Sequence, residues 1–236
     1  MHRAVYGGGE NFNYDGSVME YVTIASTGNA SDFGDLSVAR NQQLSGNISN
    51  TTRGIFGHGS RGAAGYTNTI DYITIASTGN ASDFGDMTLI SGELARIGSS
   101  MSNGHGGIDH SVYHATLPAA IGLFGGSATK ATVIQYINIA STGNTIMFGD
   151  LSIGRSYLSG GIASSTRAIF AGGNDTSTNY SDVIDFVAFS TKGKATDFGN
   201  LTTGRHGVAS TSNSTRGVTG GGTTGSNSNV IDYITI

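Results

Sequence analysis

The stretch Ile70-Asp71-Tyr72-Ile73-Thr74-Ile75-Ala76-Ser77-Thr78-Gly79-Asn80-Ala81-Ser82-Asp83-Phe84-Gly85-Asp86-Met87 decides the fold, because the chain carries it five times. The other copies start at Met19, Ile134, Ile184 and Ile231, and the last comprises only the six residues to Ile236. Most starts are therefore about fifty residues apart. Self-similarity at such a period predicts a repeat architecture.

Two further elements recur with the same period. A short apolar run closed by glycines precedes each copy, as in Arg53-Gly-Ile-Phe-Gly-His-Gly59, and recurs at 3–9, 120–126, 167–173 and 216–222. Such a run predicts a strand that ends in a backbone bend. Runs of small residues follow the Phe-Gly-Asp motif at 44–47, 158–161 and 208–211.

Together these elements predict four strands per period, which we letter in chain order. Strand A is the small-residue run, strand B the glycine-closed run and strand C the Ile-Asp-Tyr-Ile-Thr-Ile run, and strand D follows Asp-Phe-Gly-Asp. Thr-Gly-Asn at 27–29, 78–80 and 142–144 has the composition of a turn between strands C and D. About fifty residues in four strands, repeated without a helical period, are typical of a β-propeller blade. We therefore expect an all-β propeller.

The pattern within strand C agrees with this architecture. Tyr72, Thr74 and Ala76 share one face of the strand, and Ile73 and Ile75 share the other. Neither face is wholly polar, which indicates a sheet that lies between two neighbours rather than a sheet with one face in water.

The repeats fill the chain without a linker, so we expect a single propeller domain over 1–236. Its copies lie near 3–52, 53–119, 120–166, 167–215 and 216–236. The first copy enters at strand B and the last stops after strand C. Five blades with two incomplete edges, four blades with an overhanging pair of strands, and truncation of a longer array all fit this count. Incomplete edge blades favour self-association.

Composition excludes several classes of function. The net charge of the 236-residue chain is −4 without a basic block, so we expect no nucleic-acid partner. No run of 18 apolar residues occurs, so we expect no membrane insertion. Met1 leads at once into repeat sequence, so we expect no signal peptide. The absence of cysteine excludes disulfides and thiolate metal sites.

The residues resemble a known family. A strand that ends in Gly-Gly, followed by an aromatic residue (Tyr21, Tyr72, Tyr136, Phe186 or Tyr233), resembles the kelch repeat. The kelch Trp is missing, and Phe33, Phe84, Phe148 and Phe198 stand in for it at a longer spacing. The consensus of the copies, IDYITIASTGNASDFGDL followed by an Arg and then STRGIFGGG, resembles kelch-like repeats in virion structural proteins of marine cyanophages. This resemblance implies a propeller of kelch-like four-stranded blades in a phage tail or another virion component, and it implies no catalytic residues.

Repeated aspartates and arginines are the most regular charged features. Asp32/Asp35 and Asp83/Asp86 recur as pairs, with Asp150 and Asp197 as single members. A carboxylate ring could bind calcium, but we interpret these residues as turn caps and partners of the repeated arginines. Arg40, Arg155 and Arg205 follow the Phe-Gly-Asp motif, and Arg3, Arg53, Arg167 and Arg216 open strand B. We expect structural ion pairs on the surface, worth about 0–1 kcal/mol each.

The segment 57–62 matches the dinucleotide-binding pattern Gly-x-Gly-x-x-Gly. That site needs a helix directly after the loop, to aim its amide groups at the pyrophosphate. Here a strand is expected instead, so we predict no cofactor.

One insertion breaks the repeat, near 90–118. It contains His105, Asp109, His110, Tyr113 and His114. A metal would need a helix to bring His110 and His114 together, because the two would be ~13 Å apart on a strand. Gly106-Gly107 and Pro118 do not favour a helix, so we predict no metal site. We interpret the insertion as a rim loop, which is either inert or a recognition loop for a glycan or a partner protein.

No nucleophile–base pair or carboxylate dyad stands out from the repeat, so we expect no enzyme and no catalytic residues. The leading hypothesis is a virion protein of a tail or fibre, located in the phage particle. Its partners would be other virion proteins or a host-surface glycan or protein. The alternative is a lectin-like module with one weak sugar site per blade. A polysaccharide-degrading enzyme would have to use the insertion, through His110, Tyr113 or His114.

Overall fold

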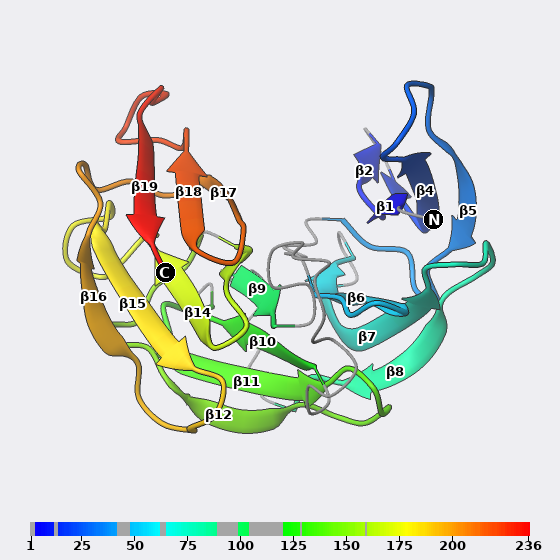
Figure 1. The fold of residues 1–236 in the computed structure, drawn as a ribbon, viewed down its shortest axis with the longest axis horizontal. Coiled ribbons are helices and arrows are strands. Elements are labelled where there is room, and N and C mark those ends of the chain that lie inside the picture. The colour runs from blue at the N-terminus through cyan, green and yellow to red at the C-terminus, as the bar shows by residue number, and fades with distance from the viewer. Residues whose placement is uncertain are drawn as a thin grey trace.

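The computed structural model describes residues 3–11, 14–41, 48–61, 65–88, 99–103, 120–127, 129–158 and 160–236. Throughout these segments all regular secondary structure is β-strand, which confirms the all-β prediction. Five antiparallel sheets of three or four strands follow one another along an open arc (Figure 1). The structure also contains a short antiparallel pair that the sequence did not predict. Its strands are β2 (Glu10–Asn11) and β3 (Tyr14–Asp15), with two residues each.

We number the five sheets as modules 1 to 5. Module 1 contains β1 (Arg3–Gly7), β4 (Val18–Thr23) and β5 (Ser31–Asp35). Module 2 contains β6 (Arg53–Ser60), β7 (Tyr66–Thr74) and β8 (Ser82–Asp86). Module 3 contains β9 (Ser99–Ser102), β10 (Ile121–Gly125), β11 (Val133–Asn138) and β12 (Ile146–Asp150). Module 4 contains β13 (Ile162–Ala163), β14 (Arg167–Ala171), β15 (Val183–Ala188) and β16 (Thr196–Asn200). Module 5 contains β17 (Ala209–Ser212), β18 (Arg216–Gly220) and β19 (Ile231–Thr235).

Each module pairs its strands in chain order, so strand B lies between strands A and C where A is present. Two of the predicted boundaries were wrong. Strand D does not follow the Asp-Phe-Gly-Asp motif but contains it, as β5 and β8 show. Strand A of module 4 lies at 162–163 instead of 158–161. The run predicted at 44–47 lies outside the described residues.

Within each module, the strands lie side by side from the inner side of the arc to its outer edge. The D strands β5, β8, β12 and β16 line the outer edge, and β9 and β17 lie on the inner side (Figure 1). Modules 1 and 5 flank the opening of the arc, and no strand of one pairs with a strand of the other.

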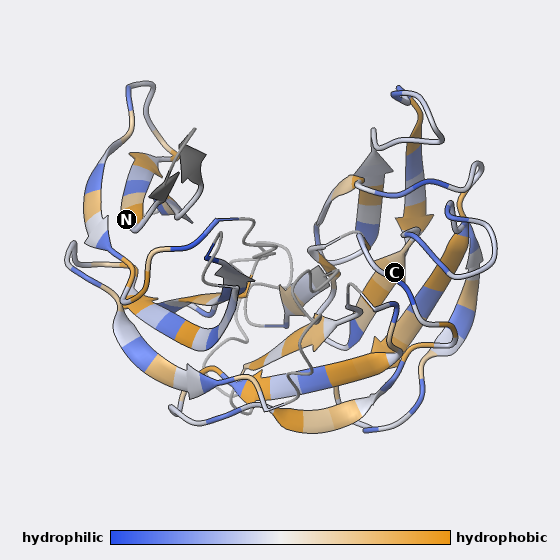
Figure 2. Ribbon diagram, turned by 180° about the vertical axis from the view of Figure 1, so that it is seen from behind, coloured by the Kyte–Doolittle hydropathy of each residue, from blue (hydrophilic) through white to orange (hydrophobic). Residues whose placement is uncertain are grey.

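The apolar cores lie between modules rather than within them, because each sheet has hydrophobic side chains on both faces. One cluster combines Met19 and Phe33 of module 1 with Phe56 and Ile73 of module 2. The next clusters combine modules 2 and 3, modules 3 and 4, and modules 4 and 5 in the same way. Apolar and polar residues alternate along many of the strands (Figure 2). In modules 2, 3 and 4 this arrangement confirms the prediction that both faces of strand C are partly buried.

Neighbouring modules are joined by backbone hydrogen bonds between a turn and a strand. The turn after strand C of module 2 donates from the Gly79 and Ala81 amides to the carbonyl oxygens of Phe33 and Asp35, at 2.7 and 2.8 Å. The pattern recurs from Gly143 and Thr145 to Phe84 and Asp86, and from Gly193 and Ala195 to Phe148 and Asp150. The predicted Thr-Gly-Asn turn therefore also holds two modules together.

This contact explains the glycine of the Phe-Gly-Asp motif. A Cβ atom on Gly34 would lie 2.4 Å from the carbonyl oxygen of Gly79, and one on Gly85 would lie 2.5 Å from that of Gly143. Both glycines also have a φ of 143°, which disfavours side chains. Any other residue would push the next module away.

Aromatic pairs join strands C and D of the same module. Tyr21 meets Phe33 edge to face, with ring centroids 6.0 Å apart, and the same geometry recurs in modules 2, 3 and 4. The arginines that open strand B lie over these rings: Arg3 over Tyr21, Arg53 over Tyr72, Arg167 over Phe186 and Arg216 over Tyr233, at 4.4–5.0 Å. These four arginines therefore make cation–π contacts, and the ion pairs predicted for them are not found in the part of the chain that the structure describes.

Module 3 obtains its cation from a neighbour. Ile121 occupies the position of the strand-opening arginine, and Lys192, from the turn of module 4, lies 4.4 Å from the centre of the Tyr136 ring. Lys192 also donates to the Tyr136 hydroxyl at 2.6 Å. The same interaction is thus made by a residue from a different part of the repeat.

The arginines that follow strand D form the predicted ion pairs, but with different partners and in a different environment. Arg155 pairs at 2.6 Å with Asp185 in strand C of the next module, and both side chains are fully buried. Arg40 pairs with Asp71, and both of these side chains are also fully buried. Arg205 pairs at 2.7 Å with Asp232, whose side chain is 10% exposed. The expectation of surface pairs was therefore wrong. Removing one partner from a buried pair costs about 3–5 kcal/mol, because the other charge is left in the interior.

Residues 57–60 of the Gly-x-Gly-x-x-Gly match belong to β6, and the next described element is strand β7 from Tyr66, not the helix that a dinucleotide site requires. His58, the second residue of the match, is 5% exposed and has a φ of 60°. The equivalent residues in the other modules are Gly8, Gly126, Gly172 and Gly221, all with positive φ. His58 is thus a larger side chain in a conformation that the repeat reserves for glycine.

We expect His58 to make the stability of the chain sensitive to acid. Burial, and secondly the Arg40 guanidinium, lower the pKa of His58 from 6.5 to about 4. The unfolded chain then binds a proton at a higher pH than the folded chain. Stability is therefore complete above pH 6.5 and is lost as the pH falls toward 4, by about 3 kcal/mol in total.

The measurement is urea unfolding of the wild type and of His58→Asn between pH 7.5 and 4. Asparagine tolerates positive φ and does not titrate. The difference in the free energy of unfolding between the two proteins should shift against the wild type across this window. Parallel pH profiles would contradict this role of His58.

Candidate functional site

The residues predicted to form a recognition loop, His105, Asp109, His110, Tyr113 and His114, lie outside the described residues. The sequence analysis interpreted the whole insertion near 90–118 as a loop. The structure shows that part of it is a strand. Ser99–Ser102, inside the predicted span, form β9 and pair with β10 as the inner strand of module 3. The extra residues follow this strand, because 18 residues separate β9 from β10 but only 3 separate β13 from β14 and β17 from β18.

The repeated aspartates of strand D make local hydrogen bonds. Asp35 accepts from the Ser17 hydroxyl at 2.9 Å, and Asp150 accepts from the Thr132 hydroxyl at 2.7 Å. Asp83 accepts from the amide of Gly85. Within the described segments, no three His, Cys, Asp or Glu side chains are grouped to hold a metal ion. The aspartates that bind arginine belong instead to strand C.

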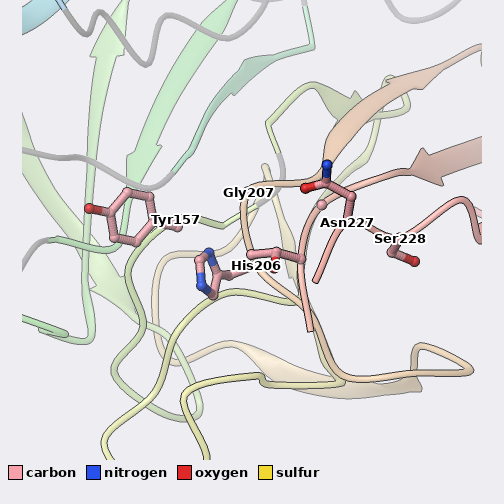
Figure 3. Close-up of a pocket in the computed structure, with 7 residues that line it drawn as sticks. Tyr157, His206, Gly207, Asn227 and Ser228 are labelled. Carbon is pink, nitrogen blue, oxygen red and sulfur yellow. The ribbon is translucent and has the colours of Figure 1, made fainter. Parts of the chain in front are cut away.

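A pocket of about 560 Å³ lies where module 5 follows module 4. It is lined by Tyr157, His206, Gly207, Gly222, Thr223, Asn227 and Ser228. In the close-up, Tyr157 and His206 lie together on one side, and Asn227 and Ser228 lie on the other (Figure 3). The pocket therefore combines aromatic rings with amide and hydroxyl groups.

His206 contacts two tyrosine rings. The Tyr180 ring stacks on it in parallel at 5.5 Å, and the Tyr157 ring lies 5.4 Å away on a tilt of 38°. Backbone hydrogen bonds between His206 and Thr223, at 3.0 and 3.2 Å, fix the position of this segment. Burial lowers the pKa of His206 below its ordinary value of 6.5, so the imidazole is neutral at pH 7.

Tyr157 is held in an unusual backbone conformation. Its φ is 52°, and the corresponding residue one module later is Gly207, with a φ of 66°. Tyr157 also accepts a hydrogen bond from the Gly207 amide at 3.2 Å through its carbonyl oxygen. A non-glycine residue in this region carries strain, and such strain is concentrated at functional sites.

Sequence reasoning missed this pocket, although a signal was present. The pairs Arg40-Asn41, Arg155-Ser156 and Arg205-His206 occupy the same place in successive modules, and each second residue forms an isolated bridge to the next module. Histidine at this place occurs only at the junction of modules 4 and 5, and Tyr157 follows the arginine one junction earlier. These departures from the repeat, rather than the long insertion, mark the described pocket.

The chemistry of the pocket suits a neutral polar ligand. Flat aromatic and imidazole rings can contact the apolar face of a small ring, and the Asn227, Ser228 and Thr223 side chains can exchange hydrogen bonds with hydroxyl groups. The pocket is therefore a candidate binding site.

Helices that could cross a bilayer are not found in the described segments. No protein-family model matches the chain, and no curated protein matches it significantly.

Proposed function

We propose that the chain is a non-enzymatic β-propeller of kelch-like blades, five of which are formed by modules 1 to 5, and that it is a structural component of a phage particle. The observation that carries this proposal is that the recurring residues make structural contacts. The turn, the glycine, the aromatic pair and the arginine of the repeat all form contacts within or between modules. A chain organised in this way forms a rigid scaffold rather than a catalytic cleft.

The propeller architecture is supported by the packing of the sheets. The sheets of modules 2, 3 and 4 each pack against a neighbour on both sides, and within a module the strands lie side by side from the inside of the arc to its outside (Figure 1). Radial stacking of four-stranded sheets produces this pattern, because each sheet is twisted and packs face to face with the next.

The assignment to a phage tail or fibre is supported by the resemblance of the repeat to kelch-like virion proteins of marine cyanophages. A repeat scaffold with few charges and many inter-module hydrogen bonds also suits a particle component, which must persist outside the cell. The partners would be other virion proteins or the host surface.

Mass spectrometry of purified virions tests the structural role. Peptides of this chain should be enriched with the known capsid and tail proteins through density-gradient purification. Recovery of the chain in the infected-cell lysate, but not in purified particles, would contradict the proposal.

The pocket favours a second function, binding of carbohydrate. Unlike the lectin alternative raised by the sequence, which places a site on every blade, the described pocket depends on His206 and Tyr157. It would therefore supply one site per chain. In a phage tail such a site would contact a host-surface glycan, so the two functions are compatible.

A glycan array screened with the purified chain should identify a ligand, and Tyr157→Ala should then weaken its binding by about tenfold, equivalent to about 1.4 kcal/mol. The control is Tyr6→Ala, an exposed tyrosine in module 1. An array without hits, or equal binding by both variants, would contradict carbohydrate binding at this pocket.

A further inference from the structure

The outer strand of module 3, β12, carries exposed apolar residues where modules 1, 2 and 4 carry polar ones. Ile146 is 57% exposed and Met147 is 43% exposed. Their counterparts in the strand register of the other three modules are Ser31-Asp32, Ser82-Asp83 and Thr196-Asp197. Because β12 lies on the outer edge of the arc, a partner can reach both apolar side chains (Figure 1).

The turn that docks on β12 departs from the repeat as well. The Gly193 amide donates to the carbonyl oxygen of Phe148 at 3.0 Å, so this turn lies against the strand. Lys192 and Lys194 flank the glycine and are exposed, whereas the turns at 27–29, 78–80 and 142–144 have threonine and asparagine at these places. The chain contains three lysines, so two of them are concentrated at this one turn.

Lys192 connects the turn with the exposed apolar residues. Its ammonium group lies 4.4 Å from the centre of the Tyr136 ring and donates to the Tyr136 hydroxyl at 2.6 Å. Tyr136 lies opposite Ile146 in the antiparallel pair of β11 and β12, so the two side chains share one face of the sheet. We call the group of Tyr136, Ile146, Met147, Lys192 and Lys194 the rim patch. It combines apolar surface with two positive charges.

Lys194 replaces a residue that has a structural role at the preceding junctions. There, Asn80 accepts a hydrogen bond from the Asp35 amide at 3.0 Å, and Asn144 accepts one from the Asp86 amide at 2.9 Å. A lysine ammonium group cannot accept a hydrogen bond. The junction of modules 3 and 4 therefore gives up a bond that the repeat uses for docking, and it gains a positive charge on the surface.

Met147 replaces a carboxylate that makes a local hydrogen bond in other modules. Asp83 accepts from the Gly85 amide at 3.1 Å, and Asp197 accepts from the Gly199 amide at 3.0 Å. Methionine offers no oxygen for such a bond. The substitution also removes the negative charge that lies at this place in modules 1, 2 and 4. Loss of a local bond and of a charge at an exposed position points to recognition rather than to folding.

We propose that the rim patch is a docking surface for an acidic peptide segment of a partner protein. The two ammonium groups would pair with carboxylates of the segment, and Ile146 and Met147 would cover an apolar side chain next to them. Complementary charges around an apolar contact are typical of protein interfaces and select among partners. At the corresponding places of modules 1 and 2, an acidic segment would meet Asp32 or Asp83, and the like charges would reject it.

The apolar part of the rim patch distinguishes a peptide from an acidic polysaccharide. A uronic or sulfated polymer would bind the lysines, but its hydroxyl and anionic groups would leave Ile146 and Met147 without an apolar partner. Burial of these two side chains contributes to affinity only when the partner has apolar side chains of its own. The composition of the patch therefore favours a peptide.

The probe for this surface is a fluorescein-labelled peptide with the sequence EELEELEELEEL. We expect saturable binding to the purified chain in fluorescence anisotropy. The peptide EESEESEESEES, which has the same charges but no apolar side chains, should bind about tenfold more weakly. Absence of saturable binding, or equal binding of the two peptides, would overturn the proposal.

Variants that restore the residues of the repeat locate the site. Lys194→Asn and Ile146→Ser introduce residues that modules 1 and 2 already carry at these places. Both variants should therefore keep the wild-type circular dichroism spectrum and melting curve. Each should weaken binding of EELEELEELEEL about tenfold, because one removes a charge and the other an apolar contact.

The control variants remove the same chemical groups elsewhere. Arg61→Asn deletes an exposed positive charge in module 2, and Ile24→Ser alters an isoleucine in module 1 that is 65% exposed. Neither substitution should change peptide binding. A control that weakens binding as much as its matched variant would show that the peptide does not dock on the rim patch.

Two other occupants would be revealed by the same variants. Heparin that binds the chain more tightly than the peptide does, and is weakened by Lys194→Asn but not by Ile146→Ser, would assign the patch to an anionic polysaccharide. A dimer in sedimentation velocity that Lys194→Asn dissociates would make the patch an interface between copies. Either result would overturn the proposal, and neither depends on the role in a virion, which particle composition tests separately.

Discussion

The close approach of a turn to a glycine is the constraint on which the rest of the structure depends. Gly34, Gly85 and Gly149 leave room for the backbone of the next module, and the turn that enters this space donates two amide hydrogen bonds. The contact sets the spacing of adjacent sheets, so their inner faces can share one apolar core. The buried ion pair of Arg155 and Asp185 joins the same two modules. A displaced module would leave one of these charges in the interior without its partner.

Function in such a scaffold is found where the repeat is broken. Residues that recur are occupied by contacts between modules, and a ligand site can arise only at positions that one junction does not share with the others. The His206 and Tyr157 pocket is a departure of this kind, and its strained tyrosine replaces a residue that the next module supplies as glycine.

The sequence predicted the all-β class, the period, and the turn between strands C and D, because backbone propensity and repetition are local properties. The sequence analysis placed strand D after the Asp-Phe-Gly-Asp motif, whereas the bulged strand contains this motif. The reason for the error is that a glycine within a short polar motif is more typical of a turn than of a strand. It also paired the arginines with the wrong aspartates. The partner of Arg155 lies thirty residues away in the next module, at a separation that only the packing of the sheets determines. The pocket was missed for the same reason, because its two sides come from different modules.

Amide hydrogen exchange measured by NMR tests the docking of turns on strands most directly, because the chain contains its own control. The amides of Gly79, Ala81, Gly143, Thr145, Gly193 and Ala195 are bonded to the preceding module, while those of Gly28 and Ala30, in the equivalent turn of module 1, are exposed and have no partner among the described residues. The account predicts that the first set exchanges more than about tenfold slower than the second. Equally fast exchange in all four turns would show that the modules are not joined in this way.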